Sequence, residues 1–152
     1  MGNTGMQVSI LSYGFWATYG VKGRLSGDDG INTAKELMTI AREAGVNCFD
    51  HAEAYGNPQG EAERIFGIAL KQLQEEDPVL WRRSELVITT KIFWGGSGVN
   101  ESGLSTKHCR EGMNACLSRL QLDYVDMVLC HRPDPFTPTI AVVRAMTDLV
   151  RN

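Results

Sequence analysis

The 152-residue sequence lacks the features that mark membrane-spanning, secreted or nucleic-acid-binding proteins. No uninterrupted apolar run approaches the roughly 18 residues that a membrane span requires. The first twenty residues contain neither the basic region nor the apolar region of a secretory signal. A net charge of −3 with mixed signs argues against nucleic-acid binding through bulk charge. We therefore expect a cytoplasmic protein with no nucleic-acid partner.

Cysteine is scarce and widely scattered, and no pair of cysteines has a C-x-x-C or other zinc-binding spacing. The four cysteines are Cys48, Cys109, Cys116 and Cys130. This spacing favours reduced cysteines packed in or near a core and indicates no metal site. The less favoured alternative is a metal site that combines cysteines with the three histidines.

What is present is a regular alternation of strand and helix patterns, with no shift in composition that would mark a domain boundary. The apolar runs predict strands at 8–13, 46–49, 86–90 and 124–130, and the three- and four-residue spacings predict helices at 28–44, 60–75, 105–120 and from 139 onward. In the third helix, Glu111 and Arg119 are expected to face water. The sequence thus predicts one domain over residues 1–152.

Four successive strand–helix units imply a parallel sheet with right-handed crossovers. A doubly wound sheet and a (β/α)8 barrel both fit this order. A dinucleotide-binding doubly wound sheet would carry G-x-G-x-x-G after its first strand, and residues 14–20 do not match. Asp50, Lys91 and His131 end three consecutive strands, a pattern typical of barrel enzymes. The barrel is therefore favoured.

Polar residues at these strand ends could form a proton-transfer site. Lys91 follows an apolar strand and needs a partner such as Asp50, because an unpaired ammonium is costly to bury. Tyr55 follows Asp50 by five residues, and an ammonium close to a phenol lowers the pKa of the phenol. His131 could orient a substrate carbonyl. Each residue alone also has an ordinary interpretation: a turn aspartate, an exposed loop tyrosine, a satisfied histidine.

These residues lie in segments that resemble the aldo-keto reductases, most closely the branch of voltage-gated potassium-channel β subunits and related oxidoreductases. The matching segments are residues 49–56, 81–96, 120–126, 131–135 and 143–147. The resemblance implies a TIM barrel, (β/α)8, of which this chain contains the first four βα units, the N-terminal half. A complete barrel typically needs about 250 residues.

The resemblance also implies roles for individual residues. Tyr55 corresponds to the family's proton donor, Lys91 and Asp50 to the pair that lowers its pKa, and His131 to the residue that orients the substrate. The family cofactor is NADP, which binds without a Rossmann motif. The cofactor-binding residues that the resemblance implies are Phe15, Trp16, Asp50 and His131.

We therefore expect an NADP-dependent oxidoreductase that reduces an aldehyde or ketone to an alcohol. His131 favours carbonyl reduction, because similar channel β subunits usually carry asparagine there. One alternative is a regulatory protein that associates with a membrane channel, and another is an inactive fragment of the barrel. A half-barrel leaves its first and fourth strand edges unpaired. If this chain is complete, we expect it to pair with a second half-barrel, its own copy, or to aggregate.

Overall fold

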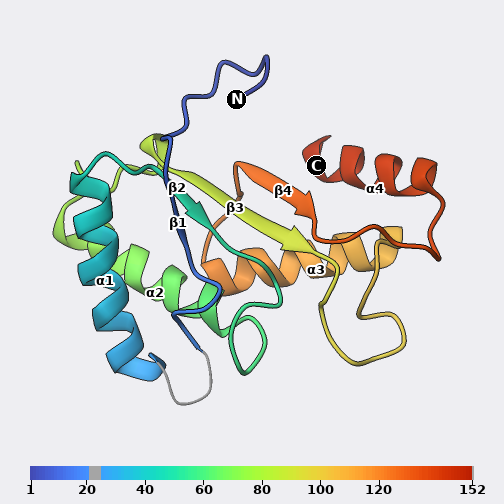
Figure 1. Cartoon of the computed structure of the whole chain (residues 1–152), viewed down its shortest axis with the longest axis horizontal. Helices are drawn as coiled ribbons and strands as arrows, with labels where there is room; N and C mark the ends of the chain where they lie inside the picture. The colour runs from blue at the N-terminus through green and yellow to red at the C-terminus, as the bar shows by residue number, and fades with distance from the viewer. Residues whose placement is uncertain (21–24, 152) are drawn as a thin grey trace.

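The protein's computed structural model describes residues 1–20 and 25–151. Four strands alternate with four helices along the chain (Figure 1). The elements are β1 (Ser12–Gly14), α1 (Gly27–Glu43), β2 (Cys48–Asp50), α2 (Glu61–Glu76), a 3-10 turn (Arg83–Glu85), β3 (Val87–Ile92), α3 (Thr106–Leu120), β4 (Met127–Cys130) and α4 (Thr139–Arg151). The predicted sequence of strand–helix units is confirmed.

The strands form one parallel sheet in the order β1-β2-β3-β4. The helices also pack in chain order, α1 against α2, α2 against α3 and α3 against α4. In Figure 1, α1, α2 and α3 lie along one side of the sheet. A doubly wound sheet would reverse its strand order and cover both faces, so this arrangement favours half of a barrel.

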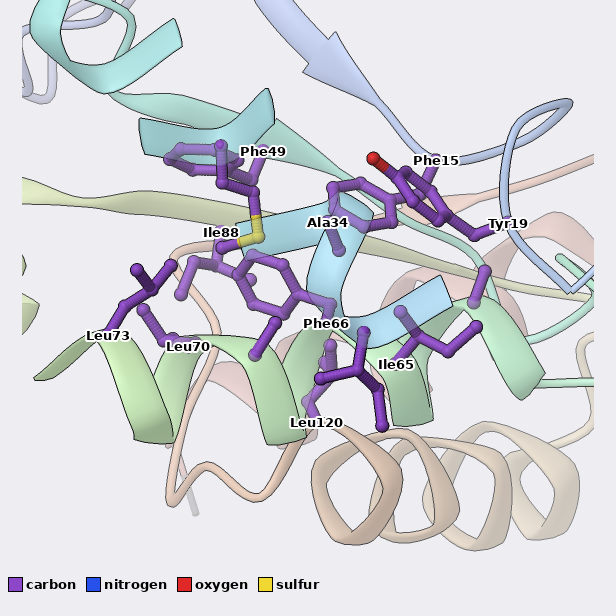
Figure 2. Packing of buried hydrophobic residues seen from close by; sticks show 14 of the residues in the cluster. Phe15, Tyr19, Ala34, Phe49, Ile65, Phe66, Leu70, Leu73, Ile88 and Leu120 are labelled. Carbon is purple, nitrogen blue, oxygen red and sulfur yellow. The ribbon is translucent and has the colours of Figure 1, made fainter. Parts of the chain in front are cut away.

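The core lies between the sheet and α1 and α2, where the apolar residues of each element meet. Phe49 of β2 and Ile88 of β3 are fully buried against Phe66 and Leu70 of α2 (Figure 2). The apolar residues of α2 recur every three or four positions, so they line one face of the helix and pack together on the sheet. This packing holds the strands in the register that brings their carboxyl ends together.

Three predicted strands are shorter in the structure because a strand needs a neighbour to pair with. β2 spans Cys48–Asp50 instead of the predicted 46–49. The pairing of β1 with β2 begins at Ser12, opposite Cys48. Ile10 and Leu11, which we predicted as strand, lie before that pair and are exposed. The predicted strand 124–130 likewise begins only at Met127, opposite Thr89, and β3 extends two residues further than expected, to Ile92.

All four cysteines are free: Cys48, Cys109 and Cys116 are buried, as expected, and Cys130 is exposed at the end of β4. Within residues 1–20 and 25–151, no group of three or more histidine, cysteine, aspartate or glutamate side chains could hold a metal ion. No helix in this described part of the chain is both long and apolar enough to cross a bilayer.

The two outer strands of the sheet have one open edge each. β1 pairs only with β2, and β4 pairs only with β3, within the part of the chain that the structure describes. The residues of β4 are partly or largely exposed, and Leu129 has 37% of its surface accessible. The unpaired edges expected of a half-barrel are therefore present.

Candidate active site

Three neighbouring strands bring polar side chains to one edge of the sheet. Asp50 is the last residue of β2, Lys91 is the second-last of β3, and His131 directly follows β4. Carboxyl ends of parallel strands meet at the same edge, and this edge holds the catalytic groups of barrel enzymes. Tyr55 lies in the loop after β2 and reaches back toward β3. The structure thus brings together all four residues of the predicted site.

Lys91 is the centre of this group. Its ammonium Nζ lies 2.8 Å from each carboxylate oxygen of Asp50 and 2.9 Å from the phenol oxygen of Tyr55. It also donates to the carbonyl oxygen of His51 at 2.8 Å. The Lys91 side chain is only 15% exposed, and this set of acceptors is what a nearly buried ammonium requires.

Asp50 is held in place by a second donor, because the hydroxyl of Thr89 on β3 donates to its Oδ1 at 2.8 Å. Asp50 lies directly opposite Thr89 in the β2–β3 register. The carboxylate therefore faces Lys91 in one orientation and pairs with its ammonium.

Tyr55 is held by its loop. Its N–H donates to the carbonyl of Ala52 at 3.0 Å, and its own carbonyl accepts from the N–H of Ala62 at 3.2 Å. The side chain is 8% exposed, and the Lys91 ammonium lies 4.7 Å from the centre of its ring. The phenol is therefore nearly buried, and a cation stands next to it.

The ring of His131 also lies near the phenol, with its centre 6.0 Å from that of Tyr55 and the two planes at 81°. Burial, reinforced by the charges of Lys91 and Arg132, lowers the pKa of His131. The imidazole is therefore neutral at pH 7. Among the described residues, its buried Nδ1 has no hydrogen-bond partner.

The two residues of the predicted Phe15–Trp16 pair lie in different environments. Trp16 is 71% exposed, and its ring centre is 6.4 Å from that of Tyr55. Phe15 is completely buried and stacks on Tyr19 at 4.7 Å. The side chain of Phe15 therefore belongs to the core, and its contact with a cofactor stays a prediction.

Three buried ionisable residues near the site were not predicted from the sequence. His51 is fully buried between the rings of Phe15 and Phe66, and burial, together with the charge of Lys91, lowers its pKa to about 3. Glu53 and His108 are also buried and face each other. The one available signal was the position of Glu53, two residues before Tyr55; nothing in the sequence links it to His108, 55 positions away.

Arg119, which we expected to face water, instead binds a buried carboxylate. Its Nε donates to Glu63 Oε2 at 2.7 Å, and Glu63 is completely buried. The other oxygen of Glu63 accepts from the hydroxyl of Thr90 at 2.6 Å. Arg119 lies in α3 as predicted, but α2 packs against the side of α3 that carries it.

The sequence is similar to a known protein family and to two plant proteins. A family model described as "Aldo/keto reductase family" matches residues 11–152. The chain is 49% identical over 146 residues to a "Probable voltage-gated potassium channel subunit beta" from Oryza sativa subsp. japonica, covering 96% of this chain and 40% of that protein. A protein of the same name from Arabidopsis thaliana is 47% identical over 150 residues, covering 99% of this chain and 42% of the relative.

A crystal structure of a thermostable aldo-keto reductase in complex with the inhibitor epalrestat superposes with a TM-score of 0.75 at 29% identity, covering 99% of this chain and 48% of that one. The chain thus spans less than half the length of each of these three proteins. The fold prediction is confirmed: the four units form one half of a TIM barrel.

Proposed function

Because this chain belongs to the aldo/keto reductase family, we propose that it carries the proton-donor site of an NADP-dependent oxidoreductase. The reaction reduces an aldehyde or ketone to an alcohol. The observation that carries this proposal is the position of Lys91, within 2.9 Å of the Tyr55 phenol and 2.8 Å of the Asp50 carboxylate. A phenol held against a charged ammonium suits the delivery of a proton to a neighbouring oxygen.

In this proposal, Tyr55 donates its hydroxyl proton to the carbonyl oxygen while hydride adds to the carbonyl carbon. The C=O double bond becomes a C–O single bond, and a phenolate remains on Tyr55. Lys91 stabilises that phenolate, and Asp50 orients Lys91. Preorganised charge at the point where charge develops is the largest contribution in many enzymes.

His131 would orient the carbonyl group. Because its pKa is lowered, the imidazole is neutral at pH 7 and carries one N–H that can donate to a carbonyl oxygen. Its ring lies 6.0 Å from that of Tyr55, so an oxygen between them can meet both groups. Trp16, exposed next to Tyr55, offers an apolar wall to the substrate.

When bound in its reduced form, NADPH, the cofactor would supply the hydride and become NADP⁺. The residues we propose to contact it are Trp16, Asp50, His131 and the backbone of Phe15. The structure is compatible with this assignment, because Trp16 is 71% exposed and the Asp50 side chain is 32% exposed at the edge where the strands end. His131 also retains a buried ring nitrogen without a partner among the described residues.

The substitution Tyr55→Phe in the native protein at its full length tests the proposal. We expect turnover of an aldehyde to be abolished, while NADPH binding, followed by tryptophan fluorescence, stays near the wild-type affinity. Tyr13→Phe is the matched control, because the Tyr13 hydroxyl binds only that of Tyr19, at 2.8 Å, within the described structure. Undiminished turnover by Tyr55→Phe would refute the assignment.

A second function is suggested by the relatives named as probable potassium channel β subunits. In this alternative, the protein is cytoplasmic, forms oligomers and binds a membrane channel as a regulatory subunit. Co-purification of a channel with the native protein, without carbonyl reduction, would favour it. Failure to bind NADPH would instead favour the remaining alternative, an inactive fragment of the barrel.

A further inference from the structure

Glu53 and His108 form a buried ionisable pair that the proposed reaction does not use. Glu53 is 2% exposed and His108 is 4% exposed, and Glu53 Oε1 lies 3.3 Å from His108 Nε2. A carboxylate removed from water needs hydrogen-bond donors, and a protein rarely keeps one in its interior without a structural or functional reason. The pair lies beside the segment that connects β2 to Tyr55.

The backbone of this segment is tied to β3 at His51 and at Glu53. Beyond the end of β2, the N–H of His51 donates to Thr89 at 3.1 Å and the N–H of Glu53 donates to the carbonyl of Lys91 at 3.2 Å. In a parallel ladder, the N–H of Phe93 would then donate to the backbone carbonyl of residue 53. It donates instead to the side-chain oxygen Oε1 of Glu53.

The Glu53 side chain, in place of the Glu53 backbone carbonyl, accepts from the Phe93 N–H, so the chain can leave the sheet after Glu53. Because the carboxylate takes the Phe93 N–H, the backbone after Glu53 is free to turn, and Tyr55 N–H donates back to Ala52 at 3.0 Å. Glu53 therefore makes two contacts with this part of the chain: its N–H binds Lys91 of β3, and its carboxylate binds Phe93, the residue directly after β3. Tyr55, two residues later, reaches the ammonium of that same lysine.

His108 holds the carboxylate from the side of α3. Ser105 caps this helix by accepting from the N–H of His108 at 3.1 Å, which fixes the first turn and directs the imidazole toward Glu53. Glycine at 112 leaves the necessary space, since a Cβ there would lie 3.0 Å from Glu53 Oε2 and 3.4 Å from His108 Cε1. Glu53 thus connects β2, β3 and α3 directly beneath the site.

We propose that Glu53 is a positioning residue, which sets the place of the Tyr55 phenol against the Lys91 ammonium, and that His108 fixes its carboxylate. This inference rests on the proposed function, because it assigns Glu53 a part in proton donation by Tyr55. Glu53 touches neither Tyr55 nor the reacting atoms in the described contacts; it acts through the backbone segment that carries Tyr55.

The test compares Glu53→Leu with Glu53→Gln in the native protein at its full length. Leucine keeps the bulk and removes the acceptor, so the Tyr55 segment loses its tie to Phe93. We expect kcat to fall about 10- to 100-fold, because misplacement of a reacting group by about 1 Å costs on the order of 100-fold. KM for NADPH should change little, and the solvent deuterium isotope effect on kcat should rise because proton transfer becomes slower.

Glutamine keeps an oxygen acceptor for the Phe93 N–H, so Glu53→Gln should retain kcat near the wild-type value. Glu61→Gln is the matched control, because Glu61 is also buried but pairs with Arg64 at the start of α2. If Glu53→Leu does not fold, Glu53→Asp replaces it, since aspartate keeps the charge but is one methylene too short to reach Phe93. Equal losses in the Gln and Leu variants would overturn the proposal.

A crystal structure of the Leu or Asp variant separates this inference from the proposed function. We expect Tyr55 Oη to have moved out of hydrogen-bond distance from Lys91 Nζ. If the two atoms stay within that distance, the positioning role is wrong, whatever the activity of the wild type. If the wild-type protein reduces no carbonyl compound, the proposed function is wrong, and the position of Tyr55 in the variant still decides the role of Glu53.

Discussion

The ammonium of Lys91 and the phenol oxygen of Tyr55 lie 2.9 Å apart, although the two residues are 36 positions apart in the sequence. β3 carries the lysine, and the loop after β2 carries the tyrosine. Because these strands are parallel neighbours, their carboxyl ends bring the two groups to one place.

Lys91→Met should lower kcat for aldehyde reduction by about 100- to 10,000-fold, the range lost when a positioned acid–base system is disrupted. Without the ammonium, nothing stabilises the phenolate that Tyr55 leaves behind. Steady-state kinetics of the full-length protein measures the effect. Lys35→Met is the control, because Lys35 on α1 pairs with the exposed Glu76 at the end of α2. The kcat of this variant should equal that of the wild type.

Arg119→Met should destabilise the protein by about 3 kcal/mol, because it leaves the fully buried Glu63 carboxylate without its cationic partner. Urea denaturation followed by tryptophan fluorescence gives the change in free energy of unfolding. Lys107→Met breaks the exposed pair with Glu111 and should cost less than about 1 kcal/mol. Similar losses in the two variants would contradict the structural role assigned to Glu63 and Arg119.

His51 should make the protein less stable as the pH falls. Its pKa is lowered to about 3 in the folded state by burial and by Lys91, whereas an unfolded histidine titrates near pH 6.5. Between these values the unfolded chain binds the extra proton, so the free energy of unfolding falls by up to about 1.4 kcal/mol per pH unit.

His51→Phe keeps an aromatic ring between Phe15 and Phe66 and removes this titration. The free energy of unfolding is measured for both proteins at pH 7, 5.5 and 4.5. The value for the variant minus that for the wild type should increase as the pH falls. A constant difference over this range would show that His51 does not titrate as predicted.

The 152-residue chain, produced alone, should associate with a second copy through the open edges of β1 and β4. Light scattering at micromolar concentration should give a mass of at least a dimer. Leu129→Lys places a charge on the β4 edge and should shift the protein toward monomer, whereas Val99→Lys, in an exposed loop, should not. A folded wild-type monomer would contradict this prediction.

The sequence by itself determined the alternation of four strands and four helices, because hydrophobic periods of two and of three to four are local properties. It also singled out Asp50, Lys91 and His131, since a polar residue at the end of an apolar strand is visible in the chain, and the family resemblance added Tyr55 to them. The start of α3 was also predicted from Ser105, because the cap is local: the Ser105 side chain accepts from the N–H of His108, three residues later.

Only the tertiary structure decided the rest. β1 and β4 begin where each meets the strand it pairs with. The burial of Phe15 depends on Phe66 of α2, and the partner of Arg119 depends on the approach of α2 to α3. The pairing of Glu53 with His108 likewise joins residues 55 positions apart. These contacts are set by sheet register and helix packing, which the whole chain determines together, so no local pattern in the sequence records them.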